Sequence, residues 1–412
     1  MKIAMLTWEY PPRIVGGISR VVYELSQKLG KLGNEVHVVT CCEACAEEFE
    51  KDDYVYVHRV RLPSIEIFDF VQWVYHFNIA MIEYLVGLIN KIGKLDLIHA
   101  HDWLVAFSAV TIKNSYCIPM ISTIHATENG RNNGIYTCLQ KYINSVEWWL
   151  TYQSSKVIVN SLYMKKEIIK IFNLPEDKVE IINNGIDIKK FKKYAYDINI
   201  RRRYARDDEK IIFFVGRLVQ EKGVSILVEA MPKIIREYND VKFVIVGKGD
   251  QDSYLKDRVN SMGIWNKVYF TGYLGDDDLR LLYRCVDVAV YPSLYEPFGI
   301  VALEAMLAGV SIVVSDVGGL GEIVQHNVDG KKFIVGNSNS LADCVLDILK
   351  DPNKSKKMVD KALQKVLEKF DWNKLEKEYR RVYTNVVEDT KKVEWKQYII
   401  EDINIQKGGE FR

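Results

Sequence analysis

The stretch Tyr291–Gly309, YPSLYEPFGIVALEAMLAG, begins at the end of an apolar run, passes through a turn and continues as a helical pattern. The apolar run that leads into it is Val286–Tyr291, and another, Val310–Ser315, follows it directly. Neither run alternates between polar and apolar residues, which is typical of parallel strands covered on both faces. A strand, a helix and a second strand joined by short turns predict a βαβ unit, and therefore a parallel sheet.

The same order of strand, turn and helix recurs along both halves of the chain. Further strands are predicted at Lys2–Thr7, Glu35–Thr40, Val55–Val60, Leu95–His99, Met120–Ile124, Lys156–Asn160, Ile211–Val215, Val241–Val246 and Val268–Thr271. Helical periods lie between most of them, as in Ile18–Leu32, where the apolar positions form one face. Two successive βαβ series predict an α/β fold of two doubly wound parallel sheets, with a ligand cleft between them.

A polar segment separates the two series. Residues 185–209, GIDIKKFKKYAYDINIRRRYARDDE, carry charges of both signs and little apolar period, which is typical of an interdomain linker. Its basic pieces also suit a nucleic-acid patch, but the neighbouring acidic residues favour a solvated linker. We therefore predict domains at residues 1–195 and 205–370, followed by a C-terminal part, residues 371–412, with a helical period at Asn373–Val387.

The composition excludes several classes of protein. The 412 residues include 56 basic and 55 acidic side chains, and a formal charge of +1 gives no electrostatic footprint for nucleic acid or an anionic membrane. The longest apolar stretch, Phe70–Ile92, contains His76, Asn78 and Glu83, which are costly in lipid, so it is predicted as a buried or interfacial helix without an integral membrane span. The first residues indicate a strand rather than a signal peptide.

Seven scattered cysteines in a chain of this size indicate reduced thiols and a cytoplasmic protein. Cys41, Cys42 and Cys45 have the spacing to begin a zinc site. No partner pair with metal spacing follows them, which favours small residues at a strand end.

Two turns in the second half have the chemistry of an anion site. The helix predicted to start at Phe298 or Gly299 offers free N–H groups beside Glu296. Glu304 lies about two turns into that helix and suits a pair of sugar hydroxyls, although a surface glutamate on a core helix is the alternative. Arg217 and Lys222, on the turn after Val215, form a two-cation clamp for phosphates or an ordinary solvated turn.

Polar residues also gather at turns of the first half. Gly16 and Gly17 join the first strand to the first helix, where paired glycines allow the backbone to approach a ligand. HAHDW, residues 99–103, and His125 follow two further strands and suit sugar hydroxyls and ring stacking, with zinc as the less favoured alternative. Three aspartates, residues 276–278, stand before a helix and are predicted to cap it rather than to bind a metal.

Taken together, the Gly-Gly turn, HAHDW, the G-R-x-x-x-x-K-G turn and E-P-F-G-x-x-x-x-E resemble the retaining glycosyltransferases of the GT-B fold, in the glycogen and starch synthase branch. The resemblance covers residues 1–390 and implies two Rossmann-like domains facing across a cleft. It implies that Arg217 and Lys222 stabilise a departing diphosphate without a metal or other cofactor. Glu304 matches a carboxylate on the ribose hydroxyls, and Glu296 one that faces the donor sugar.

The resemblance also assigns the other contacts of the cleft. The implied donor contacts are Gly16 and Gly17 near the phosphates, His125 at the donor sugar, Tyr273 on the base, and backbone N–H groups of Phe298, Gly299 and Ile300 around sugar and phosphate. The implied acceptor contacts are His101, Asp102 and Trp103, with Asp102 beside the acceptor hydroxyl. The implied C-terminal helix crosses back to the first domain. One position departs from bacterial glycogen synthases, which have lysine where this chain has Ile14.

The activity implied is transfer of a hexosyl group, glucosyl by preference, from UDP- or ADP-glucose to a glycan acceptor such as an α-glucan. The first domain would hold the acceptor and the second the nucleotide-sugar. Two alternatives stay open at this point: a transferase acting on a lipid-linked or surface glycan or a small sugar, and a non-catalytic protein that binds a nucleotide-sugar or a glycan.

Overall fold

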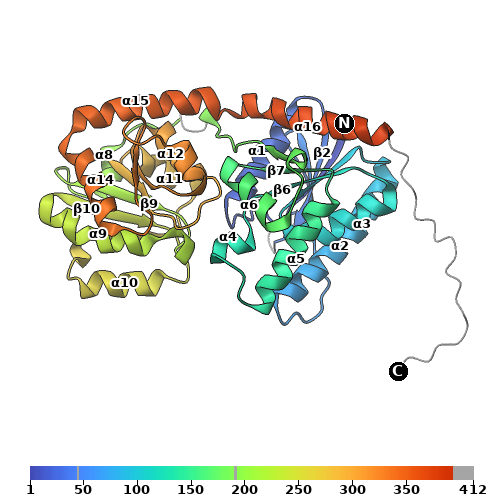
Figure 1. Ribbon diagram of the computed structural model, residues 1–412, viewed down its shortest axis with the longest axis horizontal. Coiled ribbons are helices and arrows are strands. Elements are labelled where there is room, and N and C mark those ends of the chain that lie inside the picture. Colours follow the sequence, from blue (N-terminus) through green and yellow to red (C-terminus); the bar gives the residue numbers. More distant parts are fainter. Residues whose placement is uncertain (44–45, 190–192, 393–412) are drawn as a thin grey trace, which may run out of the picture.

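The structure is a computed structural model that describes residues 1–43, 46–189 and 193–392. It consists of two α/β domains that lie side by side (Figure 1). The first domain has an eight-stranded sheet in the order β3-β4-β2-β1-β5-β6-β7-β8, and the second has a six-stranded sheet in the order β11-β10-β9-β12-β13-β14. Every pairing is parallel except β3 with β4. The predicted fold class is confirmed.

The first domain alternates strands and helices along the chain. Its strands are β1 (Lys2–Leu6), β2 (Glu35–Cys41), β3 (Phe49–Asp52), β4 (Val55–Val60), β5 (Leu97–His101), β6 (Met120–Ile124), β7 (Lys156–Val159) and β8 (Val179–Ile181). Its helices are α1 (Gly17–Lys31), α2 (Phe70–Ile92), α3 (Ala106–Tyr116), α4 (Glu128–Asn132), α5 (Cys138–Gln153) and α6 (Leu162–Phe172), with short 3-10 turns η1 (Trp103–Val105) and η2 (Glu176–Lys178). The strands β1, β2, β5, β6 and β7 are buried on both faces over most of their length, as their continuous apolar runs predict, whereas the edge strand β3 is largely exposed.

The second domain repeats the pattern with shorter connections. Its strands are β9 (Lys210–Val215), β10 (Val241–Val246), β11 (Val268–Gly272), β12 (Val288–Tyr291), β13 (Ser311–Ser315) and β14 (Lys331–Phe333). Its helices are α8 (Ile198–Arg202), α9 (Val224–Glu237), α10 (Asp252–Ser261), α11 (Asp276–Tyr283), α12 (Ile300–Ala308), α13 (Gly318–Ile323), α14 (Ser338–Lys350) and α15 (Pro352–Lys369), with 3-10 turns η3 (Gln220–Lys222) and η4 (Trp265–Lys267).

The last helix, α16 (Trp372–Lys392), returns to the first domain. Figure 1 shows α15 along one domain and α16 continuing along the other. Its buried side chains Trp372, Tyr379 and Tyr383 pack in one cluster with residues of β1 and α1. Because this contact buries large aromatic surface, it ties the end of the chain to the first sheet.

Helix α2 has the bounds that the apolar stretch predicts, Phe70–Ile92. Its inner face packs in the core of the first domain, and the buried Asn78 donates hydrogen bonds to the carbonyls of Val74 and Leu104, both at 2.8 Å. The polar group inside the apolar stretch is therefore satisfied within the protein. In the part of the chain that the structure describes, none of the helices combines the length and the apolar character that crossing a membrane requires.

Two of the predicted segments differ from the structure. The strand predicted at Leu95–His99 is β5, Leu97–His101, because pairing of Ile3 with Leu97 sets its position along the sheet. The predicted linker contains α8, whose buried Arg201 forms an ion pair with Asp287 at 2.9 Å. The guanidinium group is thus held in the second domain rather than solvated.

Candidate active site

A cavity of about 870 Å³ lies between the two domains. Of the predicted site residues, it is lined by Gly16, Gly17, His125, Arg217, Lys222, Tyr273, Glu296, Phe298, Gly299, Ile300 and Glu304. These residues come from the carboxyl ends of strands in both sheets and from the helices that follow them. Ligands bind at this edge in open parallel sheets, so the cavity is the candidate active site.

The turn after β9 carries two cations into the cavity. Lys222 Nζ lies 2.7 Å from the Glu296 carboxylate, and Arg217 Nη2 lies 2.8 Å from that of Glu221. Gly223 ends this turn with φ +62°, and a Cβ there would lie 2.0 Å from the carbonyl oxygen of Pro292. Only glycine therefore lets the Arg217–Gly223 turn lie against the turn that carries Glu296.

The turn after β12 places Glu296 at the entrance of α12. The Glu296 side chain is buried and also accepts a hydrogen bond from Ser293 Oγ at 3.3 Å. Gly299, with φ +107°, is the N-cap, so the helix begins at Ile300, one or two residues later than predicted. The positive end of the α12 dipole therefore points toward the cavity that Phe298, Gly299 and Ile300 line, which favours an anion there.

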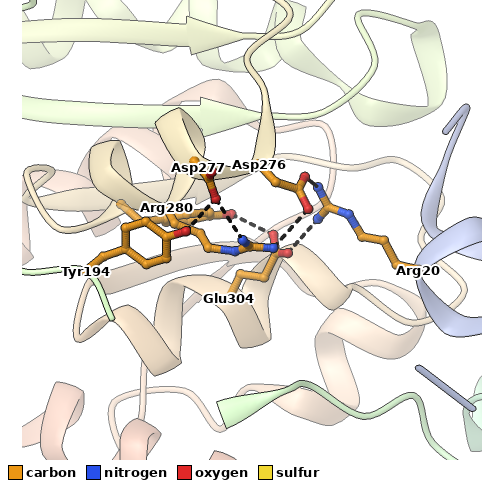
Figure 2. Close-up of polar contacts among 7 residues, drawn as sticks. Arg20, Tyr194, Asp276, Asp277, Arg280 and Glu304 are labelled. Atoms are coloured by element: carbon orange, nitrogen blue, oxygen red, sulfur yellow. Dashed lines mark hydrogen bonds and ion pairs between the residues drawn. The ribbon is translucent and has the colours of Figure 1, made fainter. Parts of the chain in front are cut away.

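Glu304 is paired across the domains (Figure 2). Its Oε1 accepts a hydrogen bond from Arg20 Nη1 of α1 at 2.6 Å, and its Oε2 accepts one from the Tyr283 hydroxyl at 3.2 Å. The second arm of the same guanidinium, Arg20 Nη2, contacts Asp276 at 2.7 Å. Asp276 lies in the first turn of α11, whose N-cap is Gly275 without a side-chain hydrogen bond. The prediction that the aspartates cap this helix by hydrogen bonding is wrong. Asp276 instead forms ion pairs with Arg20 and Arg280.

Glu9 shapes the Gly-Gly turn of the first domain. Its buried carboxylate accepts hydrogen bonds from the N–H groups of Val15 at 2.6 Å and Gly16 at 2.9 Å. Burial raises the pKa of Glu9 above its ordinary value, although the two backbone donors oppose this effect. The N–H of Gly16 is thus already engaged, whereas Gly17 faces the Ile300 side chain across the cavity. Gly17 therefore lies against a side chain of the second domain, whereas Gly16 lies against Glu9 of its own domain.

The residues before the Gly-Gly turn supply no free cation to the cavity. Ile14 lines it with a partly exposed apolar side chain. The Arg13 guanidinium lies over the Trp8 ring, 5.2 Å from its centre, and pairs with Glu43 at 3.1 Å. Arg13 therefore does not replace the lysine that bacterial glycogen synthases carry at the position of Ile14.

Three histidine rings stack in a row that leads from the cavity wall into the core. His99 contacts the Tyr383 hydroxyl of α16 at 2.6 Å, and its ring centre lies 4.1 Å from that of His101. His101 Nδ1 lies 3.1 Å from Nε2 of His125, which lines the cavity. Burial lowers the pKa of His125 to about 3, so the ring is neutral at pH 7 and offers a hydrogen bond rather than a charge.

The predicted acceptor contacts lie behind this wall. His101, Asp102 and Trp103 are buried and none lines the cavity. Asp102, at φ +59°, accepts a hydrogen bond from the N–H of His125 at 2.7 Å, and burial raises its pKa to about 6. β5 ends at His101, two residues later than predicted, so His101 lies inside the sheet rather than on the turn that follows it. In the structure His101 and Asp102 position His125.

Three cations of the cavity were not predicted: Arg20, Arg131 and Lys248, the last on the turn after β10. Arg20 lies on α1 beside the apolar face of the helix, and nothing in the local pattern distinguishes it from a solvated arginine. Arg131 of α4 is exposed and lines the cavity on the side of His125. Its charge opposes the effect of burial on the pKa of Asp102. The polar run that follows His125 was the available signal for Arg131.

The buried histidines predict a pH dependence of stability. Burial lowers the pKa of His99 to about 3, from an ordinary value of 6.5. Below pH 6.5 the unfolded chain therefore binds a proton at His99 that the folded chain does not, and the free energy of unfolding falls as pH falls. Asp102 has a raised pKa, so its protonation makes the free energy of unfolding rise as pH falls. The contribution of His99 is therefore measured as the difference between the wild type and His99→Gln. Between pH 6 and 5, the free energy of unfolding of His99→Gln, measured in urea titrations, should fall by about 1.2 kcal/mol less than that of the wild type. Parallel pH profiles would contradict this.

Metal ligation was also considered for the cysteine and histidine motifs. Among the residues with described positions, no group of three or more His, Cys, Asp or Glu side chains is arranged to hold a metal ion. Cys41 is buried at the end of β2 and Cys42 is partly buried, while Cys45 lies outside the described residues.

Comparison with known proteins identifies relatives along nearly the whole chain. Residues 197–365 match the family described as "Glycosyl transferases group 1", and residues 15–190 match "Glycosyltransferase Family 4". The chain is 43% identical over 392 residues to the uncharacterized glycosyltransferase MJ1607 of Methanocaldococcus jannaschii, covering 94% of this chain and 99% of that protein. It is 34% identical over 399 residues to a glycogen synthase of Mycobacterium tuberculosis, covering 93% and 94%.

Solved structures agree on the fold. The sucrose-phosphate synthase of Thermosynechococcus elongatus superposes with a TM-score of 0.82 at 22% identity, over 94% of this chain and 99% of that one. Anabaena HepE in complex with UDP-glucose superposes with a TM-score of 0.76 at 20% identity, over 93% and 100%. Since relatives above 30% identity span both domains and the cleft between them, this chain belongs to the group 1 glycosyltransferases of the GT-B fold.

Proposed function

We propose that this glycosyltransferase moves a glucosyl group from UDP- or ADP-glucose to an α-glucan, with retention of the anomeric configuration and without a metal. The observation that carries the proposal is the convergence of Arg217, Lys222, Glu296 and Glu304 on one cleft, with His125 facing them from the first domain. The similarity to a glycogen synthase over both domains supports the choice of acceptor.

The donor is held mainly by the second domain. Arg217 and Lys222 bind the diphosphate, Arg217 through its planar fork and Lys222 as a point charge. Glu304 accepts hydrogen bonds from the ribose hydroxyls, and the base stacks on the exposed ring of Tyr273 at the rim of the cavity. The position of the phosphates at the α12 N-terminus adds the favourable field of the helix dipole.

The glucosyl group lies between Glu296 and His125. The bond from its anomeric carbon to the diphosphate oxygen breaks, and a bond to the acceptor hydroxyl oxygen forms on the same face. The departing diphosphate accepts the hydroxyl proton. Catalysis then depends on stabilising the charge that develops on the diphosphate, which is the task of the two cations and the helix end. Phe298, Gly299 and Ile300 supply the backbone around the sugar and phosphate.

Behind the wall, His101 and Asp102 fix the ring and the backbone of His125, and Trp103 packs edge-on against Phe70 of α2 with ring centres 6.1 Å apart. In this proposal His101, Asp102 and Trp103 support the cavity wall from behind and do not touch the acceptor.

Retention is tested on the product. Purified enzyme is incubated with glycogen and radiolabelled UDP- or ADP-glucose, and the labelled polymer is then digested. We expect an α-glucosidase to release the label and a β-glucosidase to release none, because displacement on one face preserves the α configuration of the donor. Release by the β-specific enzyme would contradict the proposed mechanism.

Metal independence is tested in the same assay. Because two protein cations neutralise the diphosphate, we expect an excess of EDTA to leave the initial rate unchanged. A rate that falls with EDTA and returns with Mg²⁺ or Mn²⁺ would show that a bound cation does part of this task.

A lipid-linked acceptor is the second candidate. The segment before α2 and the first residue of that helix expose three large apolar side chains: Ile65 is 51% exposed, Phe68 75% and Phe70 47%. Such a cluster suits contact with a lipid surface. A lipid acceptor predicts that the protein sediments with vesicles and that Phe68→Ser abolishes this. Protein that stays in the supernatant with every vesicle would count against this candidate.

A further inference from the structure

The carboxylate proposed to bind ribose already has partners in the structure. Glu304 uses one oxygen for Arg20 at 2.6 Å and the other for Tyr283 at 3.2 Å. Its side chain is only 10% exposed, so solvent contributes little. A pair of ribose hydroxyls uses these two oxygens as acceptors. Each carboxylate oxygen can accept two hydrogen bonds, but a side chain that is only 10% exposed leaves little room for a hydroxyl beside Arg20 at Oε1. The Arg20 contact and a ribose contact at Oε1 therefore compete.

Arg20 belongs to the other domain, so this competition concerns the contact between domains. Its two arms connect α1 to α12 through Glu304 and to α11 through Asp276. Figure 2 shows the guanidinium of Arg20 reaching both carboxylates from the opposite side of the cleft. The two negative charges raise the pKa of Arg20, with Glu304 as the largest cause. Charge-assisted hydrogen bonds of this kind are stronger than neutral ones, particularly where side chains are partly buried.

The network continues from Asp276 to the segment between the domains. Arg280 contacts Asp276 at 2.9 Å and Asp277 at 3.4 Å, and Tyr194 donates a hydrogen bond to Asp277. The Arg280 guanidinium also lies 5.9 Å from the centre of the Tyr194 ring. If Arg20 Nη1 loses its contact with Glu304, Arg20 Nη2 still contacts Asp276, and Arg280 holds Asp276 in place. Release of one arm therefore does not leave an unpaired guanidinium in the cleft.

We infer that Arg20 is a positioning residue whose first arm holds Glu304 until the ribose hydroxyls of the donor replace it, so that occupancy of the ribose subsite loosens the contact between α1 and α12. This inference rests on the proposed function, because it takes Glu304 as the ribose-binding carboxylate. It adds a residue of the first domain to the determinants of donor affinity. Arg20 lowers the affinity of the donor by competing with ribose.

A second contact between the domains provides a matched control. Glu322 of α13 accepts hydrogen bonds from the N–H groups of Leu162 at 3.0 Å and Tyr163 at 2.5 Å, at the start of α6. Like Arg20 it connects the domains through a charged group, but it does not touch Glu304 and does not line the cavity. Glu322→Gln therefore weakens a domain contact without altering competition for the ribose subsite.

The test measures binding of UDP and ADP and of their 2′,3′-dideoxy analogues by calorimetry. Arg20→Gln should bind the nucleotide with intact ribose about three- to tenfold more tightly than the wild type, because one charge-assisted competitor is removed. Affinity for the dideoxy analogue should be unchanged. Arg20→Lys keeps the charge but not the planar guanidinium. Its affinity for the nucleotide with intact ribose should therefore lie between those of the wild type and Arg20→Gln. Glu322→Gln should leave the ratio of the two affinities at the wild-type value.

Three results would overturn the inference. Weaker binding of both nucleotides by Arg20→Gln would mean that Arg20 contacts the nucleotide itself. An unchanged ratio would mean that Arg20 does not compete with ribose, and an equal change in Glu322→Gln would mean that the effect comes from domain contact alone. Failure of the wild-type protein to bind UDP, ADP or GDP would instead defeat the proposed function, and this inference with it.

Discussion

Alanine in place of Lys222 should lower kcat for glycosyl transfer about 10²- to 10³-fold while the fold persists. Lys222 Nζ lies 2.7 Å from Glu296 at the start of α12, where the diphosphate charge is proposed to develop. Loss of this charge affects the transition state more than the bound donor, so KM should change less than kcat. Arg217→Ala should act in the same direction. Steady-state kinetics and the thermal midpoint of each variant measure the two effects.

The second domain offers controls of matched environment. Lys233 is 24% exposed and pairs with Asp343 at 2.5 Å, whereas Lys222 is 22% exposed. For Arg217, which is 46% exposed, the counterpart is Arg258, 42% exposed and paired with Glu229. Neither control lines the cavity. Lys233→Ala and Arg258→Ala should therefore leave kcat near the wild-type value. Near-normal turnover in both Lys222→Ala and Arg217→Ala would contradict the proposed mechanism.

The second large effect is expected from Gly223→Ala. The added Cβ would lie 2.0 Å from the Pro292 carbonyl oxygen, which belongs to the turn that carries Glu296. The two turns must then separate, which moves Lys222 away from Glu296. We expect a loss of about 2–4 kcal/mol in the free energy of unfolding and at least tenfold weaker nucleotide binding. Urea denaturation and calorimetry measure these quantities.

A control substitution at Gly263 distinguishes the cost of backbone strain from the cost of the steric clash at Gly223. Its φ of +69° is close to the +62° of Gly223, but a Cβ at Gly263 would meet no atom within 4 Å. Gly263→Ala should therefore cost about 1 kcal/mol and leave nucleotide binding unchanged. Equal effects of the two substitutions would mean that the close approach to Pro292 does not position the clamp.

The sequence predicts the parts of this molecule that depend on local pattern. Met120–Ile124, Val241–Val246 and the helix Phe70–Ile92 have the predicted bounds because buried apolar runs and turn residues delimit them. The short edge strands β3, β8 and β14 were missed, since FEKD, VEI and KKF contain no continuous apolar run. The position of a strand along a sheet is not a local property. β5 lies two residues later than predicted, so His101 belongs to the strand and lies behind the cavity wall.

The pairings of the site are still less accessible to sequence reasoning. Glu304 was singled out for its place on the helix after β12, yet its partner Arg20 lies 284 residues earlier in the chain. Asp276 looked like a helix cap, because that is the usual role of an aspartate before an amphipathic helix. Only the packing of the two domains brings Arg20 to both carboxylates.

Glucan-dependent release of nucleotide is the most direct test of the proposed function. Purified enzyme is given UDP-, ADP- and GDP-sugars, each with and without glycogen, and the released nucleoside diphosphate is measured. We predict that glycogen stimulates release of UDP or ADP from the glucosyl donor, and that Lys222→Ala abolishes the stimulation while Lys233→Ala does not. A donor that binds but is not turned over faster with glycogen would contradict the assignment of an α-glucan acceptor.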